Sequence, residues 1–100
     1  MAGPRVYYVI FIELKYGSFS EAQQKAAADI AAHVARSKQL HAQGKVIMAG
    51  AFLDRPEESL STMAVCISRE ADEEYIQGDP FLIKGMVSHW YIREWANMFA

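Results

Sequence analysis

The residue of this chain best suited to acid–base chemistry is His33, which lies in an alanine-rich stretch with helical spacing. Because an imidazole titrates near neutral pH, it can accept a proton and return it. A histidine at the edge of a buried helix face can equally donate a ring N–H to a carbonyl and do no chemistry. The sequence leaves both interpretations open, and the catalytic one requires a carboxylate that orients the ring.

Two aspartates could provide that carboxylate. Asp79 directly precedes Pro80, where an aspartate is also the expected N-cap of a short helix. Asp29 lies one helical turn before His33 and could pair with an imidazolium at a modest gain in stability. The spacing alone does not show which aspartate pairs with His33. It also does not show whether Asp79 pairs with His33 or only caps the short helix.

The other histidines and the single cysteine predict no further chemistry. His41 lies near the end of the expected helix, where a positive charge interacts well with the helix dipole, and we interpret it as structural. The role of His89, in an expected strand, is open. Cys66 lies in an apolar run and is interpreted as a core residue.

The motifs of metal and cofactor sites are missing from the sequence. No pair of histidines or cysteines has metal-ligand spacing, so we expect no bound metal. The chain also has no glycine-rich phosphate loop and no Gly-x-Ser-x-Gly elbow. The sequence therefore predicts no cofactor and no serine hydrolysis.

One long helix over residues 21–43 is expected to carry His33. At about 100° per residue, its apolar face has His33 at one edge. The residues near the centre of that face are Ala26, Ala27, Ile30, Val34, Ser37 and His41. Ser18 or Ser20 can form a capping box at its start, and Gly44 follows as the left-handed residue that ends it.

Runs of β-branched and aromatic residues predict strands, and helical spacing with capping residues predicts two further helices. The expected strands cover residues 6–14, 46–53, 60–67 and 87–94, the helices cover residues 70–77 and 81–84, and a tail covers residues 95–100. Ser68 can cap the helix at 70–77. Gly50 suggests a bulge or a close approach of a ligand or backbone within the second strand.

The order strand, helix, strand, strand, helix, strand predicts a single α+β domain over residues 1–100. Its most economical arrangement is ferredoxin-like, a four-stranded antiparallel sheet with both helices on one face. The residues on the bare face are then Tyr7, Val9 and Phe11 or Tyr8, Ile10 and Ile12 of the first strand, and Trp90 and Ile92 or Val87, His89 and Tyr91 of the last. Because such an apolar face is rare on a monomer, the sequence predicts a homodimer packed sheet against sheet.

The composition fits one globular domain with a full core. The chain has 100 residues, of which 52% are hydrophobic. Its net charge of −2, with mixed charges and no basic patch, argues against a nucleic-acid partner. We expect no targeting signal and no membrane span, because the first apolar run is short. A single cysteine suits a reducing cytoplasm.

Four groups of residues together resemble the YCII-related (YciI-like) family. They are His33 with Leu40, the run from Gly44 to Asp54, Asp79-Pro80-Phe81 with Gly85, and Ile92-Arg93-Glu94-Trp95. The resemblance covers about residues 6 to 95. It implies a dimeric α+β barrel built from ferredoxin-like protomers.

The same resemblance implies that His33 and Asp79 match the histidine and aspartate regarded as the family's active-site pair. One relative is a dehydrochlorinase acting on a chlorinated hydroxyhydroquinone, and related folds include muconolactone isomerase. Proton abstraction from a small cyclic or aromatic acid-like compound is the implied chemistry. Two positions depart from the family pattern: Ala51 replaces a usual proline, and Ile30 replaces a common arginine, which could remove an anion-binding group.

These observations predict a small cofactor-independent lyase or isomerase in which His33 moves a proton and Asp79 fixes its tautomer. The substrate pocket is expected between helices and sheet, with Phe52 and Phe81 as apolar walls and Gly50 giving access. The alternative is a non-catalytic protein that binds a small molecule beside catabolic enzymes. A purely structural pair is the third possibility.

Overall fold

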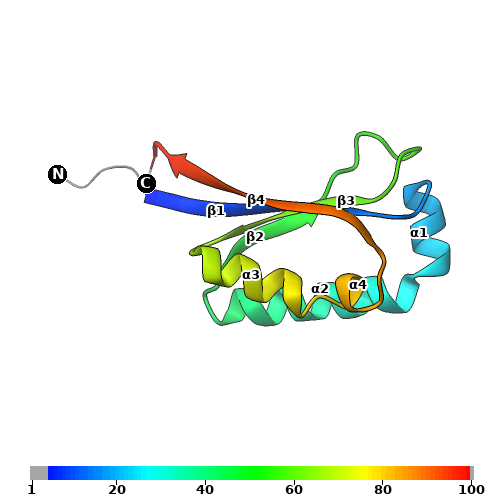
Figure 1. Cartoon of the computed structure of the whole chain (residues 1–100), viewed down its shortest axis with the longest axis horizontal. Helices are drawn as coiled ribbons and strands as arrows, with labels where there is room; N and C mark the ends of the chain where they lie inside the picture. The colour runs from blue at the N-terminus through cyan, green and yellow to red at the C-terminus, as the bar shows by residue number, and fades with distance from the viewer. Residues whose placement is uncertain (1–4, 100) are drawn as a thin grey trace.

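Four strands and four helices make up the part of the chain that the computed structural model describes, residues 5–99 (Figure 1). In chain order they are β1 Arg5–Leu14, α1 Phe19–Lys25, α2 Ala27–Ala42, β2 Val46–Ala51, β3 Ser61–Cys66, α3 Arg69–Gln77, α4 Pro80–Ile83 and β4 Val87–Asn97. None of the described helices is long and apolar enough to cross a membrane.

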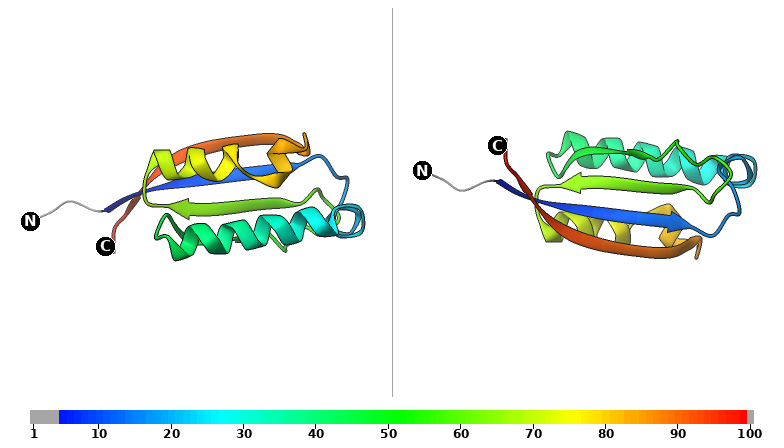
Figure 2. Two further views of the ribbon diagram at one scale, coloured as in Figure 1. Left: turned by 90° about the horizontal axis from the view of Figure 1, so that it is seen from below. Right: turned by 90° about the horizontal axis from the view of Figure 1, so that it is seen from above.

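The strands form one antiparallel sheet in the order β2-β3-β1-β4. Helices α2, α3 and α4 lie on one face of it, with α2 toward β2 and α3 on the side of β4, and none of the described helices covers the opposite face (Figure 2). This is the ferredoxin-like α+β topology that the element order predicts. The sheet therefore has one covered face and one open face.

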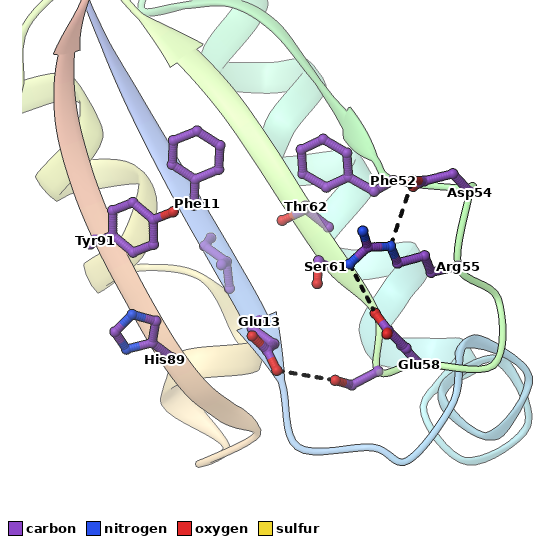
Figure 3. A pocket seen from close by; sticks show the side chains of 12 residues that line it. Phe11, Glu13, Phe52, Asp54, Arg55, Glu58, Ser61, Thr62, His89 and Tyr91 are labelled. Atoms are coloured by element: carbon purple, nitrogen blue, oxygen red, sulfur yellow. Dashed lines mark hydrogen bonds and ion pairs between the residues drawn. The ribbon is translucent and has the colours of Figure 1, made fainter.

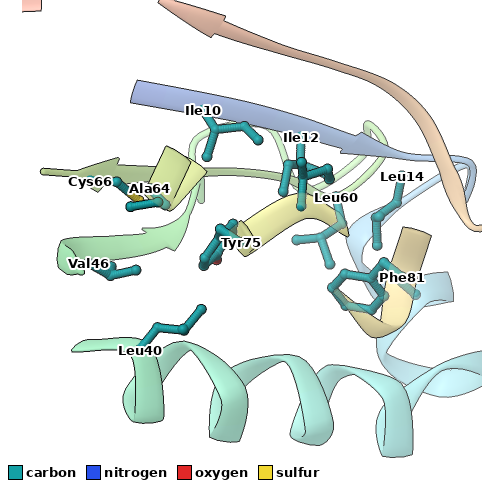
Figure 4. Packing of buried hydrophobic residues seen from close by; sticks show 13 residues of the cluster. Ile10, Ile12, Leu14, Leu40, Val46, Leu60, Ala64, Cys66, Tyr75 and Phe81 are labelled. Carbon is teal, nitrogen blue, oxygen red and sulfur yellow. The ribbon is translucent and has the colours of Figure 1, made fainter. Parts of the chain in front are cut away.

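The hydrophobic core lies between the covered face and the helices (Figure 4). Its fully buried members include Ile10, Ile12 and Leu14 of β1, which alternate along the strand as period-two side chains must. Tyr75 of α3 and Phe81 of α4 close the core from the helix side. Burial of this cluster fixes the positions of α2, α3 and α4, and so of the candidate site.

The expected single helix over residues 21–43 is wrong, because α1 and α2 are separate helices that meet at Ala26. Ala26 has φ −128° and ψ 26°, outside the helical region, and α1 turns away from the axis of α2 (Figure 1). The turn brings the Phe19 N–H to the carbonyl of Pro56 (3.1 Å) and buries Ala22. Neither proline nor glycine marks this break, so tertiary contacts set it.

The signals at the helix ends are confirmed where they depend on a single residue. Ser18 accepts a hydrogen bond from the Glu21 N–H (3.0 Å), and Ser68 accepts one from the Ala71 N–H (3.1 Å). Gly44 adopts φ +79° directly after α2 and its cap, as the left-handed C-terminal position requires.

The buried face of α2 differs from the expected one. His33 and Leu40 are its buried residues, whereas Val34 is 42% exposed. Because alanines lie on all sides of this helix, the periodicity of its apolar residues defines the buried face poorly. The contacts of α2 with β2 and α4 decide the face instead. His33 thus lies deeper than the edge position that the sequence assigns to it.

The expected strand boundaries are wrong at two places. β2 ends at Ala51, and its irregularity lies between Val46 and Met48 rather than at Gly50, which pairs regularly with β3. One extra residue there changes which face each later side chain of β2 occupies. β4 continues to Asn97, so the expected tail is wrong over residues 95–97; residue 100 lies outside the described residues.

The open face carries the first of the two expected sets on β1, Tyr7, Val9 and Phe11, since the alternate residues are in the core. Phe11 stacks on Tyr91 of β4, with ring centroids 5.0 Å apart. Val87 packs against the core, so its expected grouping with Tyr91 is wrong. The register shift next to Leu14, its partner on β1, accounts for this.

Candidate active site

The fold brings His33 and Asp79, 46 positions apart in the chain, into direct contact. Nδ1 of His33 in α2 lies 2.5 Å from Oδ1 of Asp79, which directly precedes α4. Their residues are 9% and 1% exposed. A short contact between an imidazole and a carboxylate at this depth fixes both the ring orientation and the nitrogen that faces the carboxylate.

The side chain of Asp79 does not cap α4. Asp79 occupies the N-cap position with φ −70° and ψ 131°, but its carboxylate makes no capping hydrogen bond. Pro80 at the first helical position has no N–H, which reduces the number of donors that need a cap. The carboxylate is thereby left for His33.

The alternative partner Asp29 is engaged elsewhere. Its Oδ1 lies 2.5 Å from Nζ of Lys84, at the end of α4. The interpretation of Asp29 as the partner of His33 is therefore wrong. The physical reason is that the fold places the charged ammonium group of Lys84 beside Asp29. Lys84 is 55 positions away in the chain, so the helical spacing could not show this contact.

Arg36 holds α2 against α3 and so sets the distance between the site residues. Its Nη1 and Nη2 donate to the carbonyls of Tyr75 (2.7 Å) and Glu74 (2.6 Å), near the C-terminal end of α3. These carbonyls belong to the last turn, which has few intrahelical partners. Gly78 lies directly under the guanidinium, where a Cβ atom would overlap the Arg36 side chain.

The remaining surroundings of His33 come from α3, α4 and its own helix. Phe81 stacks on the ring with centroids 4.7 Å apart and planes at 28°. Tyr75 meets the ring edge-on, and its Oη lies 3.3 Å from Nε2 of His33. Oγ of Ser37 lies 3.1 Å from Oη of Tyr75 and 2.8 Å from the carbonyl oxygen of His33.

The electrostatics of this cluster follow from burial. Burial raises the pKa of Tyr75 to about 12, and the Asp79 carboxylate adds to the rise while the Ser37 hydrogen bond opposes it. Oδ2 of Asp79 is buried without a hydrogen-bond partner among the described residues. His33 is thus the one polar side chain in the described part of the chain that compensates the buried carboxylate.

A cavity of about 440 Å³ lies between α2 and β2, and His33 forms part of its wall. Gly50 and Phe81 line it too, as the sequence predicts. A Cβ atom on Gly50 would meet nothing within 4 Å, so this stretch of β2 leaves open space. The titratable lining residues are His33, Lys38 and His41. The sequence assigns His41 a structural role alone and does not predict that it lines the cavity.

His41 also has the structural role that the sequence predicts, but with a specific partner. Its Nδ1–H donates to the carbonyl of Val46 (2.7 Å) and so ties the end of α2 to the start of β2. Because Nδ1 is occupied, Nε2 is the ring nitrogen left for other contacts.

Phe52 does not line this cavity, and its expected role as a wall is wrong. It lines a second hollow of about 330 Å³ on the open face, together with Phe11 and Tyr91 (Figure 3). The irregularity at the start of β2 directs positions 48, 50 and 52 toward the open face, by their pairing with β3, and so places the side chains of Met48 and Phe52 there.

Sequence reasoning missed Tyr75 and did not single out Ser37 for chemistry. Ser37 lies one turn after His33 on the same helix, so the helical period could have shown it. Tyr75 lies on another helix, and no local pattern connects it to His33. Among the residues that the structure describes, no three metal-ligating side chains converge on a common point.

Fold and site together define a small ferredoxin-like α+β protein with a buried histidine–aspartate pair at the wall of a cavity. A family model for the YCII-related domain matches residues 6–96. The chain therefore belongs to the YCII-related domain family. No curated protein matches it at a significant level.

Solved structures with the same fold have low sequence identity to this chain. The 5-chloro-2-hydroxyhydroquinone dehydrochlorinase of Burkholderia phenoliruptrix, in complex with 2,5-dihydroxybenzoquinone, is similar with a TM-score of 0.65 and 18% identity, over 91% of this chain and 94% of that one. A protein from Shewanella oneidensis is similar with a TM-score of 0.62 and 11% identity, over 96% and 95% of the two chains. At these identities, the likeness establishes the fold alone.

Proposed function

We propose that this protein is a cofactor-independent lyase or isomerase that moves a proton on a small organic compound. The observation that supports it most directly is the 2.5 Å contact between His33 and Asp79 at the wall of the 440 Å³ cavity. Family membership and the likeness to a dehydrochlorinase are consistent with it, since removing HCl from an organic compound requires loss of a proton.

In the proposed reaction, His33 accepts a proton from a C–H group of the bound compound, and Asp79 stabilises the resulting imidazolium. Return of the proton to a different atom completes an isomerisation, whereas departure of a leaving group completes an elimination. Positioned acid–base groups of this kind contribute roughly 10²- to 10⁴-fold to a rate. Phe81 supports the ring by stacking, and Gly50 keeps the β2 side of the cavity open.

The proposal is tested by proton exchange. Lactones, halogenated quinols and muconate-like acids are incubated with the protein in D₂O, and deuterium uptake and product formation are followed by NMR. His33→Ala should abolish turnover, and Asp79→Asn should lower kcat by about 100-fold or more, because the carboxylate no longer stabilises the imidazolium.

Asp29→Asn is the matched control, since Asp29 lies on the same helix as His33 but pairs with Lys84. It should retain turnover close to the original value. Unchanged turnover in His33→Ala would end the assignment of His33. A loss in Asp29→Asn as large as that in Asp79→Asn would remove the specific role of Asp79.

A second function, binding without conversion, has support in the hydrogen bonds of His33. Both ring nitrogens already have protein partners, Asp79 at Nδ1 and Tyr75 at Nε2. A compound that binds in the cavity, with no deuterium uptake in any member of the screen, would favour an accessory protein over an enzyme.

We further propose a homodimer that packs open face against open face. Aromatic and apolar side chains lie exposed on this face; Met48 is 62%, Tyr91 42% and Trp95 49% exposed. Water contact with such a surface is unfavourable, and a second copy offers a surface of the same shape and chemistry. The measurement that tests it is the molar mass in solution at micromolar concentration.

A further inference from the structure

The Nε2 nitrogen of His33 has the phenol of Tyr75 as its hydrogen-bond partner. Tyr75 is 2% exposed and is not among the residues that line the cavity, and its Oη lies 3.3 Å from Nε2. Nδ1 is held by Asp79. The phenol of Tyr75 is therefore the protein group placed to exchange a proton with Nε2.

Ser37 connects that phenol to the cavity. Its Oγ lies 3.1 Å from Oη of Tyr75, and Ser37 itself lines the cavity. The sequence of contacts Asp79, His33, Tyr75, Ser37 thus runs from a buried carboxylate to the space where a ligand can bind. Each step in it is within hydrogen-bond reach.

Two settings of the hydroxyl hydrogens satisfy this chain, one for each charge state of the ring. With a neutral ring, Ser37 donates to Tyr75 and Tyr75 donates to Nε2, while the Nδ1–H donates to Asp79. With a charged ring, the Nε2–H donates to Tyr75, Tyr75 donates to Ser37, and Ser37 donates to the His33 carbonyl, 2.8 Å away. In both settings each ring nitrogen and each hydroxyl hydrogen has a hydrogen-bond partner.

The acidity of Tyr75 suits a residue that passes protons without keeping a charge. Burial raises the pKa of its phenol to about 12, so the hydroxyl retains its hydrogen at neutral pH. A hydroxyl that both donates and accepts can transfer a proton in a concerted step.

We propose that Ser37 and Tyr75 form a proton relay between the cavity and Nε2 of His33. A proton from the cavity binds to Ser37 Oγ, the hydrogen of Ser37 passes to Tyr75 Oη, and the hydrogen of Tyr75 passes to Nε2. One proton has then left the cavity, both hydroxyls are restored, and the imidazolium pairs with Asp79. The relay rests on the proposed function, in which the proton comes from the substrate. The same transfers in reverse order return the proton to the substrate. Tyr75 is then a positioning residue for His33.

A first experiment needs no substrate. The exchange of the His33 Nε2–H with water is measured by NMR, at a pH where the ring is charged, in the intact protein and in Tyr75→Phe, Ser37→Ala and Ser37→Thr. The relay predicts exchange at least about tenfold slower in Tyr75→Phe and Ser37→Ala, and exchange close to the original rate in Ser37→Thr, which restores a hydroxyl. Unchanged or faster exchange in the first two variants would show a direct route to the ring and overturn the relay.

A second experiment uses any compound that shows turnover. Tyr75→Phe and Ser37→Ala should lower kcat by about tenfold or more with KM within twofold, because the chain acts on proton transfer and not on binding. Tyr8→Phe is the control: Tyr8 stacks under Arg69, lines neither hollow, and loses the same hydroxyl. Full kcat in both relay variants would overturn the relay and leave His33 as the acid–base group. If turnover were unchanged in Tyr75→Phe, in Ser37→Ala and also in His33→Ala, the proposed function itself would be overturned.

Discussion

The two sides of the sheet differ in which side chains they bury and which they expose to water. The covered face buries polar groups completely: Asp79 is 1% exposed and Asp72 is fully buried. The open face exposes large apolar groups, with Tyr91 and Trp95 each more than 40% exposed. Groups that lack water must find protein partners, whereas exposed apolar groups gain most from a partner surface. The first situation favours chemistry and the second favours association.

The two hollows repeat this contrast in their charges. The titratable groups lining the covered-face cavity are all basic: His33, Lys38 and His41. The open-face hollow has carboxylates from Glu13, Asp54 and Glu58, with Arg55 and His89 beside them (Figure 3). Arg55 lies 3.7 Å from Glu58 and 4.0 Å from Asp54, so part of this charge is compensated within the hollow. An anionic ligand therefore has a clear electrostatic preference for the covered-face cavity.

The largest expected effect concerns the open face. Tyr91→Glu places a charge on the proposed dimer interface, where it would be desolvated on association, and should weaken the dimer by about 100-fold or more. Sedimentation velocity over a concentration series measures this. Ile83→Glu is the control, because Ile83 is 69% exposed on α4, in the helix layer. A dimer that survives Tyr91→Glu but not Ile83→Glu would move the interface to the helix side.

The next effect concerns the buried carboxylate of Asp72. Burial raises its pKa to about 6, and the Cys66 thiol and the Arg69 guanidinium offset only part of this. Neither carboxylate oxygen has a conventional hydrogen-bond partner among the described residues. The folded state thus binds the proton more tightly than the unfolded state. Stability should fall as pH rises from about 4 to about 6.

Asp72→Asn removes this ionisation and tests the pH dependence. It should raise the free energy of unfolding by about 2 kcal/mol at pH 7 and have little effect near pH 4, where Asp72 is protonated in the folded state. Urea unfolding at both pH values measures the difference. A stabilisation that is equal at both pH values would mean that removal of the charge is not its cause.

The smallest effect concerns ligand charge. Lys38 is exposed, lines the covered-face cavity and forms no ion pair with a carboxylate among the described residues. Lys38→Gln should weaken benzoate binding by about fivefold, which is about 1 kcal/mol, and leave benzyl alcohol binding unchanged. Lys15→Gln removes an equally exposed lysine that lines neither hollow. Equal weakening by both variants would indicate a general charge effect.

Local signals predicted those features that depend on a few neighbouring residues. Ser18 and Ser68 cap their helices, and Gly44 ends α2, because each needs only a hydroxyl or a missing Cβ at one position. The order of the elements likewise predicted the topology, since few arrangements of six segments cover one sheet face. The family resemblance rests on motifs of this local kind.

Predictions that depend on what a residue meets across the fold were less successful. Nothing local shows the break at Ala26, which follows from the contacts of α1 with the β2–β3 connection. The position of Phe52 depends on one extra residue in β2, and a shift of one residue moves a side chain to the other face. Asp29 has the right spacing to pair with His33, and only the fold places Lys84 beside it.

The sequence by itself determined the kinds of groups available for chemistry, the order of the elements and the apolar character of both sheet faces. Only the tertiary structure decided that Asp79 rather than Asp29 faces His33, that Tyr75 occupies its other nitrogen, and that Phe52 lies on the open face. The reason is physical: helix caps and strand alternation depend on neighbours along the chain. The partner of a buried polar group is instead whichever group packing brings within about 3 Å, and side chains far apart in the chain compete for that place.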